Sequence, residues 1–304
     1  MREIPKEYII LDHLINFIVP GLDPKLFENL TTLSPVDQNC SDWFNKFVSM
    51  IVKSIESKTF LPTLRASDGE YRFLFCDQKP SKRHTFWEYY KRLILYWIDY
   101  VNPIKSGFHG ITSPGVSVGD YSRVEWIAGR INSESGLRLV LSKGILAAHL
   151  SFSHTPFQEH FHPELERWLK NNKLNLALEN YVPFYFVYTL LQEPYRHIVF
   201  SDRRILLVHS ASGEKRDRIE TALYKYGARS IDWLSISRNK SVLETISPSR
   251  DQLNNDICLM GAGVGKFNIV KQLTDFKGPV LDAGYYFEAW ANPDIASKRT
   301  LCSV

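Results

Sequence analysis

The chain has 304 residues and a formal net charge of +4, with 44% apolar and 23% charged residues. This length can bury a full hydrophobic core, in one large domain or two small ones. The net charge is too small to indicate nucleic-acid binding, which needs a clustered basic face, but it is compatible with anionic small molecules or an acidic membrane surface. Four widely spaced cysteines are typical of reduced thiols in a cytoplasmic protein. Neither a signal peptide nor a membrane-spanning run is predicted.

The first 58 residues are expected to form an N-terminal helical extension. Its clearest helix is predicted to begin with Ser41 as N-cap and to bury an apolar stripe made of Trp43, Phe44, Phe47, Ile51, Val52 and Ile55. Residues 59–304 are expected to form one domain. It begins with a strand at 59–64, a turn at 68–70 and a short helix. A further helix is predicted at 85–101, strand content around 107–112, and a short strand at 137–144.

The C-terminal third of the chain alternates strand and helix patterns. Strands are predicted at 203–210, 228–237, 255–261 and 277–284, with helices at 217–227 and 266–276. This alternation predicts an α/β fold, namely a Rossmann-like open, mostly parallel sheet with helices on both faces. Ligands of such sheets bind over the carboxyl ends of the strands. The loops at these ends should therefore form the functional site.

Two of these loops could hold a phosphate group. In HSASGEKRDR (209–218), amides around Ser212 and Gly213 could cradle a diphosphate together with Lys215. A solvated helix start with ion pairs one turn apart is the alternative. GAGVGK (261–266) misses the Walker pattern, because three residues separate the glycines where four are needed and Phe267 follows the lysine. It could be a plain strand-to-helix turn, or Gly261 and Gly263 could approach a ligand.

The turn Asp68-Gly69-Glu70 follows the first strand of the domain, with Arg65 just before it. Carboxylates two residues apart on a turn can face one hard cation. The same residues could also form an ordinary helix start, with Asp68 as N-cap and Glu70 favouring the helix dipole.

Taken in order, these segments resemble the motifs of the GT-D glycosyltransferases, a bacterial family. The turn at 68–70 resembles that family's RFGDGE signature, and Gly213–Arg216 resembles its GEKSR-type segment. Met260–Val264 resembles its LGPTA segment, and Leu281–Gly284 followed by Glu288, Ala289 and Trp290 resembles its acidic and aromatic ending. The sequence departs from the family at Ala66-Ser67, in the GAGVG loop and at Tyr285. Residues 1–58 and 140–200 have no counterpart in the family's motifs.

The resemblance implies a metal-dependent glycosyltransferase. It would move a sugar from a nucleotide-diphosphate donor to a glycan or lipid-linked acceptor in bacterial surface-polysaccharide biosynthesis, in the cytoplasm and at the inner face of the membrane. Asp68 and Glu70 would hold a divalent cation, manganese or magnesium. Glu288 or Asp282 would be the catalytic base. The residues implied to bind the donor are Arg65, Ser67, Asp68, Ser212, Gly213, Lys215, Gly261 and Gly263.

Two other functions stay open on the sequence. A GxGxG loop also occurs in S-adenosylmethionine-dependent methyltransferases, although there it follows the first strand of the fold. A non-catalytic nucleotide-sugar-binding protein would bind the same ligand without turnover. Binding of S-adenosylmethionine without a metal would indicate the first, and binding without turnover the second.

Overall fold

The computed structural model describes residues 38–66, 68–75, 90, 94, 123–148, 165, 167–177, 179–184 and 186–292. The predictions for residues 1–37, 85–101 and 107–112 lie outside these ranges, apart from Tyr90 and Ile94, which are helical. For Asp68, only the backbone belongs to the described part.

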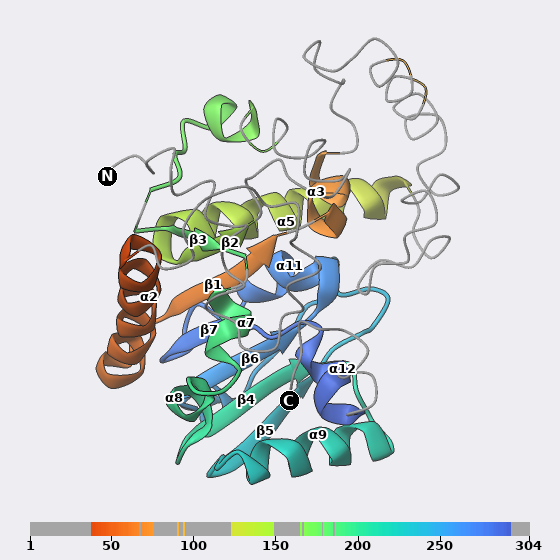
Figure 1. The fold of residues 1–304 in the computed structure, drawn as a ribbon. Helices are drawn as coiled ribbons and strands as arrows, with labels where there is room; N and C mark the ends of the chain where they lie inside the picture. The colour runs from red at the N-terminus through yellow and green to blue at the C-terminus, as the bar shows by residue number, and fades with distance from the viewer. Residues whose placement is uncertain are drawn as a thin grey trace.

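The described residues form one all-parallel, seven-stranded sheet in the order β3-β2-β1-β7-β6-β4-β5 (Figure 1). Its strands are β1 (Leu61–Ala66), β2 (Ile145–Ala148), β3 (Tyr181–Pro183), β4 (Arg204–His209), β5 (Ser230–Ser235), β6 (Ile257–Gly261) and β7 (Pro279–Asp282). The inner strands are almost wholly buried. Parallel strands covered on both faces are expected to be continuous apolar runs of this kind. The predicted α/β, Rossmann-like open sheet is confirmed.

Helices cover both faces of this sheet. They are α2 (Gln38–Ser57), α3 (Asp68–Phe75), α5 (Arg123–Lys143), α7 (Phe186–Leu190), α8 (Arg196–Phe200), α9 (Gly213–Lys225), α10 (Arg250–Leu253), α11 (Lys266–Val270) and α12 (Tyr286–Ala291). Helices α5 and α11 pack against each other, and α9 packs against α12. Within the described ranges, none of these helices is long and apolar enough to cross a membrane.

The strand order reverses between β4 and β6. From β4 the chain passes through α9 to β5 on one side, whereas from β6 it passes through α11 to β7 on the other. At such a switch point the loops at the carboxyl ends of two neighbouring strands run in opposite directions, and this opens a crevice. The sheet therefore offers a ligand-binding position over the ends of β4 and β6.

Helix α2 packs into the same core as the sheet. Its Trp43 and Phe44 are buried, and their rings contact those of Tyr181, Phe186 and Tyr195. The predicted apolar stripe is buried apart from Val52, which is half-buried. The helix begins at Gln38, three residues before the predicted cap at Ser41.

The predicted strand at 137–144 is wrong, because residues 137–143 form the last turns of α5 and Gly144 follows its end. Leu137, Val140 and Leu141 are buried at helical spacing. Residues 137, 139 and 141 are also apolar at every second position, which is the spacing typical of a strand. Strand β2 begins only after Gly144, where a side chain would collide with the backbone oxygen of Pro62.

Candidate functional site

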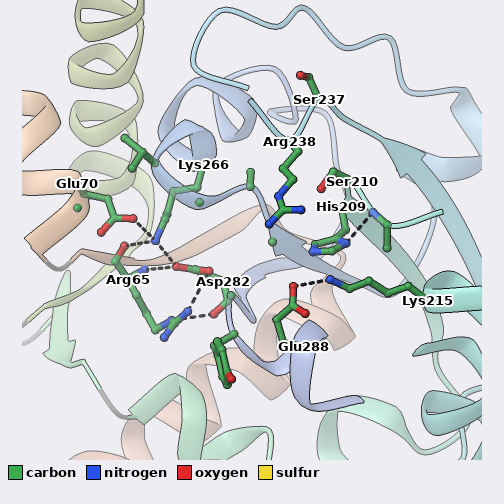
Figure 2. Close-up of a pocket in the computed structure, with 18 of the residues that line it drawn as sticks. Arg65, Glu70, His209, Ser210, Lys215, Ser237, Arg238, Lys266, Asp282 and Glu288 are labelled. Carbon is green, nitrogen blue, oxygen red and sulfur yellow. Dashed lines mark hydrogen bonds and ion pairs between the residues drawn. The ribbon is translucent and has the colours of Figure 1, made fainter. Parts of the chain in front are cut away.

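A pocket of about 510 Å³ lies over the carboxyl ends of β1, β7, β6 and β4 (Figure 2). This volume is within the range of small-molecule binding sites. The acidic and basic side chains that line it are Arg65, Glu70, His209, Lys215, Arg238, Lys266, Asp282 and Glu288. They divide into two groups at the two ends of the pocket.

The first group is a buried charge quartet of Arg65, Glu70, Lys266 and Asp282, each at most 5% exposed. The Lys266 ammonium lies 2.8 Å from Glu70 Oε1 and 2.6 Å from Asp282 Oδ2, and it donates to the backbone oxygen of Arg65 at 3.0 Å. These three contacts use all three N–H donors of the ammonium. With two cations and two carboxylates, the quartet is balanced in charge.

Arg65 is held against the end of β7. Its Nε donates to the backbone oxygen of Asp282 at 3.0 Å, and its Nη2 lies 3.3 Å from Asp282 Oδ1. The guanidinium also stacks on the ring of Tyr188, 3.8 Å from the centroid. Gly284 makes this arrangement possible, because it has a φ of +48° and any side chain there would meet Arg65 Nη2.

The pairing of opposite charges shifts the pKa of Arg65, Lys266 and Asp282 toward their charged forms. Burial alone would lower the pKa of Lys266, but attraction to Asp282 and Glu70 raises it overall. Burial alone would raise the pKa of Asp282, but Arg65 and Lys266 lower it overall. Burial alone would also lower the pKa of Arg65, but the attraction and hydrogen bonds of Asp282 and Tyr188 together raise it overall. Opposite charges at hydrogen-bonding distance compensate the lost hydration in each case.

The second group, the cationic end, lies at the start of α9. Ser212 is the N-cap residue, lines the pocket and makes no side-chain capping bond, so the amides of the first turn lack that partner. Gly213 has a φ of +54° with open space around it. Lys215 forms an ion pair with Glu288 of α12, and both side chains are more than a third exposed. Arg238, after β5, is exposed and has no carboxylate partner among the described residues.

His209 lies between these residues at the end of β4. Its ring stacks on Phe287, with 4.2 Å between centroids and 13° between planes. The backbone N–H of Ala211 donates to its Nδ1 at 2.9 Å. Burial lowers the pKa of His209 to about 4, and the cations Lys215 and Arg238 act in the same direction against the weaker opposite effect of Glu288. The imidazole is therefore neutral at physiological pH.

In the loop at 261–265, two of the three glycines are required by close packing against neighbouring residues. A side chain at Gly261 would meet the rings of Phe287 and His209, and one at Gly265 would meet Ser241. Only Gly263, with a φ of +54°, is needed for the backbone conformation itself. The loop is thus a tight strand-to-helix connection, as one of the two sequence interpretations had it, and Gly261 and Gly263 line the pocket.

Most of the site residues predicted from the sequence meet at this pocket. Arg65, Glu70, Ser212, Lys215, Gly261, Gly263, Asp282 and Glu288 line it, and Gly213 is next to Ser212. Ser67 and the side chain of Asp68 lie outside the described residues. The sequence analysis missed His209, Arg238 and Lys266. Lys266 closes the GAGVGK motif, but it was set aside with the failed Walker pattern.

The two predicted catalytic bases have different surroundings. Asp282 is 1% exposed, bonded to Arg65 and Lys266, and its pKa is lowered, so it is a poor proton acceptor. Glu288 forms an ion pair with Lys215, its side chain is 39% exposed, and it lines the pocket. The geometry favours Glu288 as the base and Asp282 as an anchor for Arg65.

A divalent cation is implied by the resemblance, with Asp68 and Glu70 as its ligands. In the structure, the ammonium of Lys266 lies between the carboxylates of Glu70 and Asp282 and forms an ion pair with each. No group of three or more potential metal-ligating side chains occurs among the described residues. Among the described side chains, the Lys266 ammonium thus takes the position between these two carboxylates that a divalent ion would need.

Comparisons of the chain with protein-family models, with curated proteins and with solved structures gave no match. The resemblance to the GT-D family stays a prediction that rests on the four ordered motifs.

Proposed function

We propose that the protein is a glycosyltransferase that takes its sugar from a nucleotide-diphosphate donor. One observation carries the proposal: at the switch point of the sheet, the first turn of α9, Lys215 and Arg238 form a cationic end in a pocket large enough for such a donor. Amides at a helix N-terminus and flexible cations are the groups that bind diphosphates in α/β folds.

The two ends of the pocket suit the two parts of this donor. The cationic end has Lys215 and Arg238 available for a diphosphate. The quartet end has no net charge, and its ions are already engaged with one another, so it suits an uncharged group with hydroxyls, such as a sugar. In this arrangement the anomeric carbon lies between the two ends, within reach of Glu288.

Transfer then needs one base and one site for the leaving group. The bond from the anomeric carbon to the diphosphate oxygen breaks, and a bond from the acceptor oxygen to the same carbon forms. The acceptor's proton passes to Glu288. Lys215, Arg238 and the α9 amides offset the negative charge that develops on the leaving diphosphate. When Lys215 turns to the diphosphate, it leaves the Glu288 carboxylate free to accept the proton.

A thermal-shift screen tests the proposal with nucleoside diphosphates, nucleotide sugars and S-adenosylmethionine, each with and without manganese. A ligand at ~100 times its Kd stabilises the folded state by about 2.7 kcal/mol, which is visible as a higher Tm. We expect a shift with at least one nucleoside diphosphate. A shift with S-adenosylmethionine and with no nucleotide would overturn the proposal in favour of a methyltransferase.

A matched pair of variants on α9 locates the binding site. Lys215→Ala should remove most of the nucleotide-induced shift. Arg218→Ala, the same loss of charge one turn later on the same helix, should keep it, because Arg218 is 61% exposed and pairs with Glu214 outside the pocket. Equal losses in both variants would mean that the ligand responds only to overall charge. Binding in the wild type without any turnover would indicate the non-catalytic alternative.

A further inference from the structure

His209 has a fixed hydrogen-bonding pattern. A backbone N–H can only donate, so the bond from Ala211 makes His209 Nδ1 an acceptor. In a neutral imidazole the single proton must then be on Nε2. The stack on Phe287 fixes the plane of the ring, and the residue is 7% exposed.

The remaining donor of His209 faces the pocket. The imidazole lines the pocket, and its bond from Ala211 is the single hydrogen bond recorded for it within the described part of the chain. In Figure 2 the ring nitrogen that is not bonded to Ala211 lies on the side of Arg238. Nε2–H is thus a buried, unpartnered donor beside the start of α9.

The charges around the ring explain why it is neutral. Lys215 on α9 and Arg238 after β5 oppose a second proton, and Glu288 on α12 favours one less strongly than burial disfavours it. A charged imidazole would add a third cation to the two already at this end. A neutral imidazole instead donates one directed hydrogen bond, and its own charge does not change with pH near neutrality.

We propose that His209 Nε2–H is the neutral donor of an anion subsite, completed by Arg238 and the first-turn amides of α9, that takes a phosphate oxygen of the ligand. The inference deepens the proposed function, but it rests only on the part of it that requires a phosphate-bearing ligand. His209 is here a binding residue that selects the position of one phosphate, and Glu288 keeps the role of base.

Nuclear magnetic resonance of the imidazole nitrogens, with inorganic pyrophosphate as the probe, tests this assignment in the unmodified protein. We expect His209 to hold its proton on Nε2 and to stay neutral from pH 8 down to pH 5. Pyrophosphate should shift the Nε2 and Nε2–H signals and leave Nδ1 nearly unchanged. A proton on Nδ1, or a doubly protonated ring at pH 6, would overturn the proposal, and so would unchanged Nε2 signals with pyrophosphate bound.

Two variants separate the two nitrogens. In His209→Asn the amide can still accept from Ala211 but does not reach the Nε2 position, whereas in His209→Gln the amide N–H reaches that position and the Ala211 contact is lost. A hydrogen bond to a charged group contributes roughly 1.5–3 kcal/mol, so the Asn variant should bind pyrophosphate about 10- to 100-fold more weakly. The Gln variant should bind it within about threefold of the wild type on the same reasoning. The reverse order would show that the Ala211 contact, and not Nε2–H, is what matters.

The possible failures can be told apart. If pyrophosphate binds through His209 but no nucleotide sugar does, the subsite stands and the glycosyltransferase proposal fails. If nucleotide sugars bind and the Asn variant binds pyrophosphate as the wild type does, the His209 assignment fails alone. If pyrophosphate does not bind the wild type, the subsite is overturned. If neither variant folds, the resonance measurement on the wild type decides.

Discussion

Glu288 and Lys215, which both line the pocket, form an ion pair. If Glu288 is the base, Glu288→Gln should lower the release of nucleoside diphosphate from the donor by about 100-fold or more, since general-base catalysis contributes about 10²–10⁴. Binding of the nucleoside diphosphate should be unchanged or tighter, because Lys215 no longer has a competing anion. Both are measured with the donor that the thermal-shift screen identifies.

Glu214→Gln is the matched control for that experiment. Glu214 is next to Lys215 in the sequence, but its side chain is 88% exposed and pairs with Arg218. It should keep wild-type turnover. An active Glu288→Gln enzyme would remove Glu288 from the catalytic role.

Neutral His209 also has a consequence for stability. Its folded pKa of about 4 is below the ordinary 6.5, so between these values the unfolded chain binds more protons than the folded one. The stabilising contribution is complete above pH 6.5 and is lost as the pH falls toward 4. With 1.36 kcal/mol for each pKa unit, the loss amounts to about 3 kcal/mol.

His209→Gln should remove this part of the pH dependence. Denaturant unfolding at pH 7.5 and pH 4.5 gives the free energy of unfolding of both proteins. The wild type should lose more stability over this interval than the variant, because the other histidines are common to both. Parallel losses would mean that His209 titrates normally in the folded protein.

At the level of secondary-structure elements, the quartet ties four segments together. Arg65 is in β1, Glu70 in α3, Lys266 at the start of α11 and Asp282 at the end of β7. Removing one partner of a buried ion pair leaves an uncompensated charge and costs about 3–5 kcal/mol. Lys266→Met should therefore lower the free energy of unfolding by about that amount, as measured by denaturant titration.

The ion pair of Lys58 and Asp256 provides the comparison. The Lys58 side chain is 46% exposed, and Asp256, which is 14% exposed, keeps Arg204 as a second partner, so we expect the pair with Lys58 to contribute at most about 1 kcal/mol. Lys58→Met removes the same charge with the same new side chain and should change stability by less than that. Similar costs for the two substitutions would show that the quartet does not stabilise the protein beyond a surface pair.

Helices and strands were predictable from the sequence where the apolar residues followed only one pattern. The buried runs of β4 and β6 could only be strands of a covered sheet, and both are found close to their predicted bounds. Residues 137–144 satisfied two periods at once, and the helix is what forms in the structure, where α5 packs against α11 and Gly136 lies against the backbone of Phe267. Local sequence does not show which partner will be present.

The site was predictable to the extent that the fold was. A parallel sheet brings its strand ends to one edge, so Arg65, Lys215, Gly261 and Asp282 could be expected to meet. Which of them pair with each other could not be foreseen, because Arg65 and Asp282 are 217 residues apart and their contact depends on β1 and β7 being neighbours. Lys266 and His209 were missed because their contacts with Glu70, Asp282 and Phe287 come from other segments of the chain.

For the whole molecule, α2 is part of the structural unit that carries the site. Phe44 is 1% exposed and packs on Phe186 and Tyr195, which precede β4. Phe44→Ala should lower the free energy of unfolding by about 3–5 kcal/mol, in a single transition for the entire sheet. Its exposed neighbour Asn45 serves as control, and Asn45→Ala should stay within about 0.5 kcal/mol of the wild type. A separate, earlier transition for α2 would show that the helix is an independent extension.

The neighbours of β7 have a consequence for how the chain reaches this fold. Strand β7 is hydrogen-bonded to β1 on one side and to β6 on the other, so it joins β3-β2-β1 to β6-β4-β5. Before β7 is made, the amino-terminal and carboxyl-terminal strands cannot close into one sheet, and β1 keeps an open edge. Pairings between residues so far apart form late and slowly. Exposed strand edges favour aggregation until β7 has been synthesised and has paired. We therefore expect a chaperone to matter most before the chain has been synthesised through β7.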